Sequence, residues 1–114
     1  MPFYESTFVV RQDVSTQEVE KVTEQFAAVI SEFKGSIVKK EYWGLLNLAY
    51  KIKKNRKGHY VMLALDVPAD CIVELERKYK LHSDVIRYLT IKVDAISDEA
   101  SPMMKRKDSK EKAA

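Results

Sequence analysis

The sequence predicts an α+β domain with a four-stranded antiparallel sheet and two helices on one face. Apolar residues alternate with a period of two in four segments and recur every three or four residues in two others, in the order β-α-β-β-α-β. A short connection that contains Asn55 and Gly58, between the two middle strands, is typical of a hairpin. The length favours one domain at residues 1–95, followed by a flexible basic C-terminal tail at 96–114.

The N-terminal third is expected to form a strand at Phe3–Val10 and then a helix. Ser15 with Glu18 three residues later has the capping-box pattern, which satisfies the first free amides of a helix. Apolar residues then recur at helical spacing as far as Phe33. Gly35 is expected to end the helix in the left-handed conformation, which glycine adopts without steric cost.

The rest of the domain is expected to form a hairpin, a second helix and a last strand. The predicted segments are a strand at Ser36–Ile52, a tip at Lys53–Lys57, a strand at Gly58–Val67, a helix from Pro68 through about Lys80 and a strand at Val85–Val93. Gly44 predicts a bulge in the first of these strands. Right-handed crossovers place the first and third strands in the centre, which is the ferredoxin-like arrangement.

Net charge, cysteine count and the length of the apolar runs limit the classes of protein to which this chain can belong. Net charge is +3 and the isoelectric point is near 8.9, too mildly basic to indicate nucleic-acid binding by itself. The one cysteine, Cys71, excludes an internal disulfide and suits a reducing compartment. Because the sequence shows no signal peptide and no apolar run of membrane-spanning length, a cytoplasmic protein is expected.

The hairpin tip is the most strongly charged stretch. Five of the seven residues from position 51 to 57 are basic and none is acidic: Lys51, Lys53, Lys54, Arg56 and Lys57. Such a cluster faces either water or an anion that neutralises it. A solvated turn and a phosphate-binding turn both remain open on the sequence alone.

The sheet face away from the helices is expected to be bare and partly apolar. Tyr60 and Met62 fall on this face, and Trp43 lies nearby on the preceding strand. Aromatic residues and methionine are enriched in interface cores, which favours a protein partner over ordinary half-buried packing. Arg87, at the start of the last strand, could pair with Asp84 or contact phosphate.

No pattern in the chain indicates catalysis, a metal or a cofactor. His59 and His82 have no ligand at metal-binding spacing. Cys71 could have a lowered pKa near its helix start, but the sequence favours a packed thiol. Gly35, Gly44 and Gly58 are the only glycines and form no phosphate-binding loop. We therefore expect neither an enzyme nor a small-molecule substrate.

Several motifs resemble one family across nearly the whole chain. They are Tyr4-Glu5, Gly35, Trp43-Gly44, Leu48-Ala49-Tyr50 with Ile52 and Lys54, His59-Tyr60-Val61, Asp84-Val85-Ile86-Arg87 and Glu99-Ala100-Ser101-Pro102-Met103 with Lys105 and Lys107. Their order and spacing resemble the bacterial small-subunit ribosomal protein S-six family. The fold of that family is the one predicted above.

The resemblance implies a ribosome-associated structural role without a cofactor. It implies binding to the central domain of small-subunit ribosomal RNA, together with the S-eighteen partner protein, during assembly. The implied RNA contacts are the hairpin cations with Arg87 and the tail residues Lys105, Arg106 and Lys107. The implied partner contacts are Trp43, Leu45, Tyr60 and Met62.

The sequence departs from that family at two points. Leu45, Leu46 and Asn47 stand where the family usually has arginines, which favours a protein contact there, and Lys51 replaces a frequent proline. The alternative is a free-standing RNA-recognition motif, in which Tyr4 would stack on a base. Two roles for the C-terminal tail also remain open: it could bind RNA, or it could only aid solubility.

Overall fold

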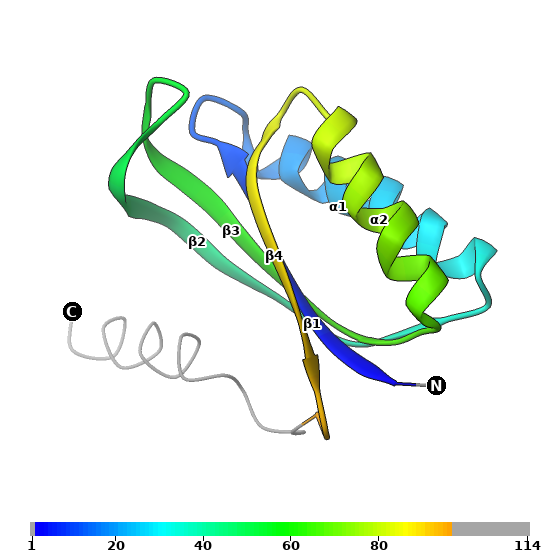
Figure 1. The fold of residues 1–114 in the computed structure, drawn as a ribbon. Coiled ribbons are helices and arrows are strands. Elements are labelled where there is room, and N and C mark those ends of the chain that lie inside the picture. Colours follow the sequence, from blue (N-terminus) through cyan, green and yellow to red (C-terminus); the bar gives the residue numbers. More distant parts are fainter. Residues whose placement is uncertain (1, 97–114) are drawn as a thin grey trace.

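The computed structural model describes residues 2–96. Its elements are β1 (Phe3–Arg11), α1 (Thr16–Glu32), β2 (Ser36–Ile52), β3 (Asn55–Asp66), α2 (Ala69–Leu81) and β4 (Val85–Val93). The strands form one antiparallel sheet in the order β2-β3-β1-β4, so the predicted central strands are confirmed. Figure 1 shows both helices on one face of the sheet, which confirms the fold class. Within residues 2–96, no helix or strand covers the other face.

The core lies between the helices and the inner sheet face, where three aromatic rings meet. Phe26 of α1 contacts Phe8 of β1 and Tyr79 of α2, with ring centroids 5.0 and 4.6 Å apart in T-shaped arrangements. All three side chains are buried. The Tyr79 hydroxyl lies 2.8 Å from the Ser6 hydroxyl, which gives this buried polar group its hydrogen bond. Burial raises the pKa of Tyr79, so the phenol stays protonated.

Helix α1 begins as predicted but ends differently. The Ser15 hydroxyl accepts a hydrogen bond from the Glu18 amide at 3.2 Å, which confirms the cap. At the other end, Lys34 takes the left-handed conformation, with φ of 58°, and the Gly35 amide donates to the Ile30 carbonyl at 3.0 Å. The expected left-handed Gly35 is therefore wrong. Glycine is needed here for space, because a Cβ would lie 2.3 Å from Cγ1 of Val67.

The predicted boundaries hold for β2 and β4 and shift by a few residues in the other elements. Pro68 precedes α2 as its cap residue, so the helix starts at Ala69. Gly44, with φ of 102°, lies at a register shift in β2, which confirms the predicted bulge. Among the described residues, no helix is long and apolar enough to cross a membrane.

Candidate functional site

The hairpin between β2 and β3 is tighter than the sequence predicts. Its turn consists of Lys53 and Lys54 alone, with φ values of 47° and 69°. Two residues of positive φ between paired strands are the mark of a type I′ turn. Lysine is a strained choice at such positions, at a cost of order 1 kcal/mol or more each. The predicted tip at Lys53–Lys57 is therefore wrong in extent, because β3 already begins at Asn55.

Asn55 holds the strained turn in place. Its side-chain Nδ2 donates to the carbonyls of Ile52 and Lys53, at 3.3 and 3.0 Å. Its Oδ1 accepts from the Gln12 amide at 3.0 Å, and the Gln12 side chain accepts from the Lys57 amide at 3.1 Å. These bonds join the hairpin to the turn after β1, which lies beside it in Figure 1. The base of the basic hairpin is thus fixed to the sheet.

We expect Asn55→Ala to loosen this hairpin and to lower the free energy of unfolding by about 1–3 kcal/mol, because it removes three hydrogen bonds to partly buried backbone groups. Chemical denaturation measures the loss, and amide hydrogen exchange locates it to the hairpin. Asn47→Ala is the matched control, since Asn47 is exposed in the same hairpin. Equal protection of the hairpin amides in Asn55→Ala and the unsubstituted protein would contradict the role of Asn55.

Strand β2 also widens the hairpin on one side. Asn47 pairs with Lys57 and Ile52 pairs with Asn55, so four residues of β2, at positions 48–51, stand opposite Arg56 alone. Tyr50, within this irregular stretch, is 64% exposed. The extra residues at positions 48–51 enlarge the exposed surface around the hairpin cations.

The hairpin cations face solvent and are free of carboxylates. All five are exposed: Lys51, Lys53, Lys54, Arg56 and Lys57. None of them forms an ion pair with another described residue. Arg87 is also exposed. Of its two alternatives, the pairing with Asp84 is not formed, and Arg11 Nε instead donates to Asp84 Oδ1 at 2.7 Å. The structure therefore leaves these six charges available to an anion.

The predicted partner residues separate into accessible and buried positions. Trp43 and Tyr60 stack on the sheet face away from the helices, with ring centroids 6.3 Å apart and planes at 18°. The Trp43 indole donates to Glu41 Oε1 at 2.9 Å, which fixes the ring. Met62 is only 2% exposed, so it offers little surface. Leu45 is 45% exposed but pairs with His59, which places it on the other sheet face.

A hollow of about 310 Å³ opens on this outer sheet face beside the stacked rings. Its lining includes Trp43, Tyr60 and Arg87, together with Leu89 of β4. Leu89 and Ile91 are 62% and 49% exposed on the same face. The sequence analysis did not identify Leu89 or Ile91. Their two-residue spacing from Arg87, which places all three on one face of β4, was the signal that could have found them. The apolar surface thus extends from β2 to β4.

The position of Tyr4 speaks against the RNA-recognition-motif alternative. Tyr4 packs against the helix-facing core, on the same side as Phe8. Stacking on RNA in that module needs aromatic rings on the open sheet face. The first strand presents Thr7 and Val9 there instead, since they pair with Met62 and Tyr60. The base-stacking role expected for Tyr4 is therefore wrong.

The histidines and the cysteine are structural. His59 is buried, with Nδ1 2.8 Å from the Tyr42 hydroxyl and Nε2 2.9 Å from the Val14 carbonyl, so both ring nitrogens are satisfied. Cys71 is fully buried, and burial raises the pKa of its thiol. The alternative of a lowered pKa is therefore not supported, and the predicted packed thiol is confirmed. Within residues 2–96, no three acidic, histidine or cysteine side chains are placed to hold a metal.

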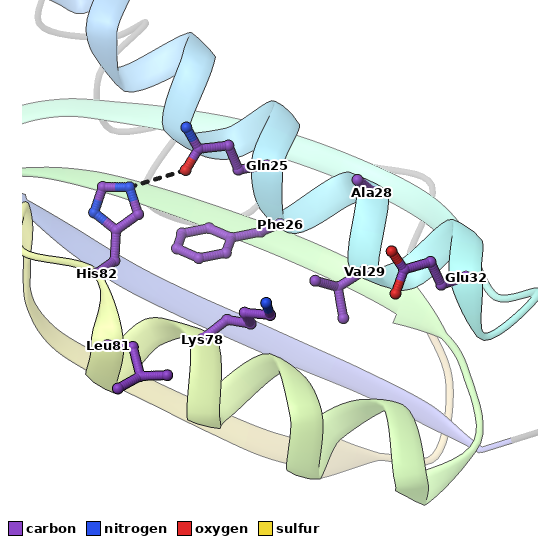
Figure 2. A pocket seen from close by; sticks show the side chains of 8 residues that line it. All are labelled: Gln25, Phe26, Ala28, Val29, Glu32, Lys78, Leu81 and His82. Carbon is purple, nitrogen blue, oxygen red and sulfur yellow. Dashed lines mark hydrogen bonds between the residues drawn. The ribbon is translucent and has the colours of Figure 1, made fainter.

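A groove of about 400 Å³ lies between the two helices (Figure 2). Phe26 lies at its base, and the His82 ring hydrogen-bonds to Gln25 Oε1 at 3.0 Å across it. Glu32 and Lys78 give it one charge of each sign. No predicted site residue lines this groove, so we assign it to helix packing. The predicted tail residues Lys105, Arg106 and Lys107 lie outside the described residues.

Comparison with known proteins identifies the family. The family model described as ribosomal protein S6 matches residues 3–92. Small ribosomal subunit protein bS6 of Rickettsia canadensis is 52% identical over 109 residues, covering 96% of this chain and 90% of that protein. The bS6 protein of Rickettsia rickettsii is 51% identical over the same coverage.

A solved structure agrees with these relatives. The crystal structure of 30S ribosomal protein S6 from Thermotoga maritima matches with a TM-score of 0.76 at 28% identity, and the match covers 98% of this chain and 96% of that one. The family model spans both helices and all four strands except the last residue of β4, and the relatives share about half of their residues with this chain. The chain therefore belongs to the ribosomal protein S6 family.

Proposed function

We propose that the chain is a structural component of the bacterial small ribosomal subunit, acting in the cytoplasm. In this role it binds the central domain of small-subunit ribosomal RNA during assembly, together with the S-eighteen partner protein. The names of its relatives, which are small-subunit ribosomal proteins, support the assignment to that particle. The role is one of binding and positioning, without a catalytic step or a cofactor.

The observation that carries RNA binding is the unpaired positive charge of the hairpin. Its five cations are exposed, free of carboxylate partners in the described chain, and mounted on a turn that Asn55 ties to the sheet. Clustered cations repel one another, and RNA phosphates relieve this repulsion while releasing condensed counterions. On sequence alone, we extend the RNA contact to Lys105, Arg106 and Lys107.

The outer sheet face supports the second half of the proposal. Trp43, Tyr60 and Leu89 surround an apolar hollow next to Arg87, and exposed Ile91 extends the same surface. An aromatic and aliphatic centre with a charged rim is the usual composition of a protein interface. We assign this face to the S-eighteen partner and the hairpin to RNA, with Arg87 at the border between the two surfaces.

We expect the isolated chain to bind a central-domain RNA transcript weakly, and at least about tenfold more tightly when the partner is present, because the partner adds its own contacts. Filter binding at several salt concentrations measures both affinities. Equal RNA affinity with and without the partner would overturn the joint mode of binding.

A matched pair of variants tests the partner surface by isothermal titration without RNA. Leu89→Glu places a carboxylate on the outer face and should weaken binding to the partner by at least about tenfold, because it would leave a charge buried in the interface. Val73→Glu is the control, since Val73 is 71% exposed on α2, away from that face. If Val73→Glu were the more damaging change, the partner would have to bind the helices instead.

A further inference from the structure

A second hollow, of about 310 Å³, brings together three cations that are distant in the sequence. Lys53 comes from the hairpin turn, Lys80 from the last turn of α2 and Arg87 from the start of β4. Neither the sequence pattern nor the family resemblance singled out Lys80. We infer that this hollow binds a backbone phosphate of RNA, an inference that rests on the proposed RNA-binding function.

The fold fixes the three sources of charge in different ways. Lys53 has a positive φ, and its carbonyl accepts from Asn55, so the turn cannot swing freely. Arg87 pairs with Val9 in the ladder between β1 and β4. Lys80 stands on a helix whose tyrosine, Tyr79, is anchored in the core. Because the three backbones are already fixed, binding an anion costs only the freedom of the three exposed side chains.

The charged residues that line the hollow are all positive. None of its lining residues is a carboxylate. The nearest acidic residue in sequence, Asp84, already accepts from Arg11 at 2.7 Å. Lys80 and Lys78 stand at the end of α2 where the helix dipole is negative, and they offset that partial charge. A phosphate entering the hollow therefore meets net attraction.

Apolar and aromatic side chains form the rest of the lining and give the hollow its shape. Val85, Ile86 and Tyr88 line it beside the cations, and the Tyr88 ring packs on Tyr79 with centroids 5.4 Å apart. Apolar side chains keep water from one side of the hollow, which strengthens the attraction of the exposed cations for an anion held there. Three cations of this kind bind a phosphate group and do not discriminate between RNA bases. The role of the hollow would be to set the direction of the RNA backbone between the hairpin and the end of α2.

The test uses the full chain with its partner and a central-domain RNA transcript. The variant Lys53→Gln/Lys80→Gln/Arg87→Gln removes the three charges while keeping side chains of useful length. We expect its RNA affinity to fall by about tenfold or more near 0.1 M salt, and the salt dependence to become shallower by about one unit in log–log slope per phosphate released. Lys80→Gln alone should show part of this loss, although all five hairpin cations and Arg87 remain.

The control is Lys92→Gln, an exposed lysine on β4 outside the hollow, which should bind RNA like the unsubstituted protein. If the triple variant keeps the original affinity and slope while the unsubstituted protein binds RNA, the hollow has no role and the proposed function stands. If the unsubstituted protein fails to bind RNA at all, the proposed function falls and the hollow's assignment with it. An NMR titration with inorganic phosphate adds one arm: shifts at Lys80 and Arg87 without any loss of RNA binding in the triple variant would mean a free-anion site and overturn the RNA assignment.

Discussion

Replacing Lys53, Lys54, Arg56 and Lys57 together by alanine is expected to weaken binding to the central-domain RNA by at least about 100-fold near 0.1 M salt. Each lysine or arginine that neutralises a phosphate contributes up to about 0.9 to the log–log slope of affinity against salt. The quadruple variant should therefore show a shallower salt dependence as well as weaker binding. Filter binding over a salt series measures both quantities in one experiment.

Loss of charge anywhere on a basic protein weakens RNA binding somewhat, so the control must remove the same charge elsewhere. Four exposed lysines outside the hairpin serve this purpose: Lys21, Lys34, Lys78 and Lys92. Their replacement by alanine should reduce affinity by only a few-fold, since long-range attraction is screened beyond about 10 Å. Equal effects of the two quadruple variants would mean that net charge, and not the hairpin, drives binding.

The hairpin should keep its shape in the quadruple variant. The bonds that define its base involve Asn55, Gln12 and main-chain groups, none of which the substitutions remove. Alanine also has no greater difficulty than lysine at the positive φ values of positions 53 and 54. Exposed substitutions of this kind change stability by about 0.5 kcal/mol or less each. A cooperative thermal transition near that of the parent would verify this.

The sheet was predictable because its core faces are strongly patterned. Phe8 and Val10 of β1, and Leu63 and Leu65 of β3, alternate with outward residues, and a period of two fixes which face each residue occupies. The end of the hairpin has no such pattern, since its residues are cationic on both faces. Only the positive φ of Lys53 and Lys54 defines the turn, and lysine seldom adopts that conformation. The sequence therefore overestimated the length of the tip.

The cations of the hairpin could be predicted from the sequence, but the cation that joins them from α2 could not. The hairpin cations form a continuous run in the sequence. Lys80 becomes a candidate site residue only because the fold brings the end of α2 beside β4 and the hairpin turn. The bulge at Gly44 explains why Leu45 does not share a sheet face with Trp43, because one extra residue in β2 moves the residues after it to the opposite face. Met62 shows a different limit: its face was predicted, but its burial was not.

The largest effect on stability is expected from Phe26→Ala, which should lower the free energy of unfolding by about 3–5 kcal/mol. Phe26 is 2% exposed and is the one ring of α1 that contacts both Phe8 and Tyr79. Its removal deletes two edge-to-face contacts and leaves a cavity where α1, α2 and the sheet meet. Because domains are stable by only about 5–15 kcal/mol, this loss would leave a large unfolded fraction. Urea denaturation followed by far-ultraviolet circular dichroism measures it.

Two further variants separate packing from aromatic geometry. Phe26→Leu keeps most of the buried volume, so it should cost clearly less than Phe26→Ala, with the difference reporting the cavity. Val73→Ala, at an exposed position on α2, should change stability by about 0.5 kcal/mol or less. If Phe26→Ala cost no more than Val73→Ala, the helices would not be held to the sheet through this ring. The positions of Lys80 and the hairpin relative to one another would then lack the rigid support that joint phosphate binding requires.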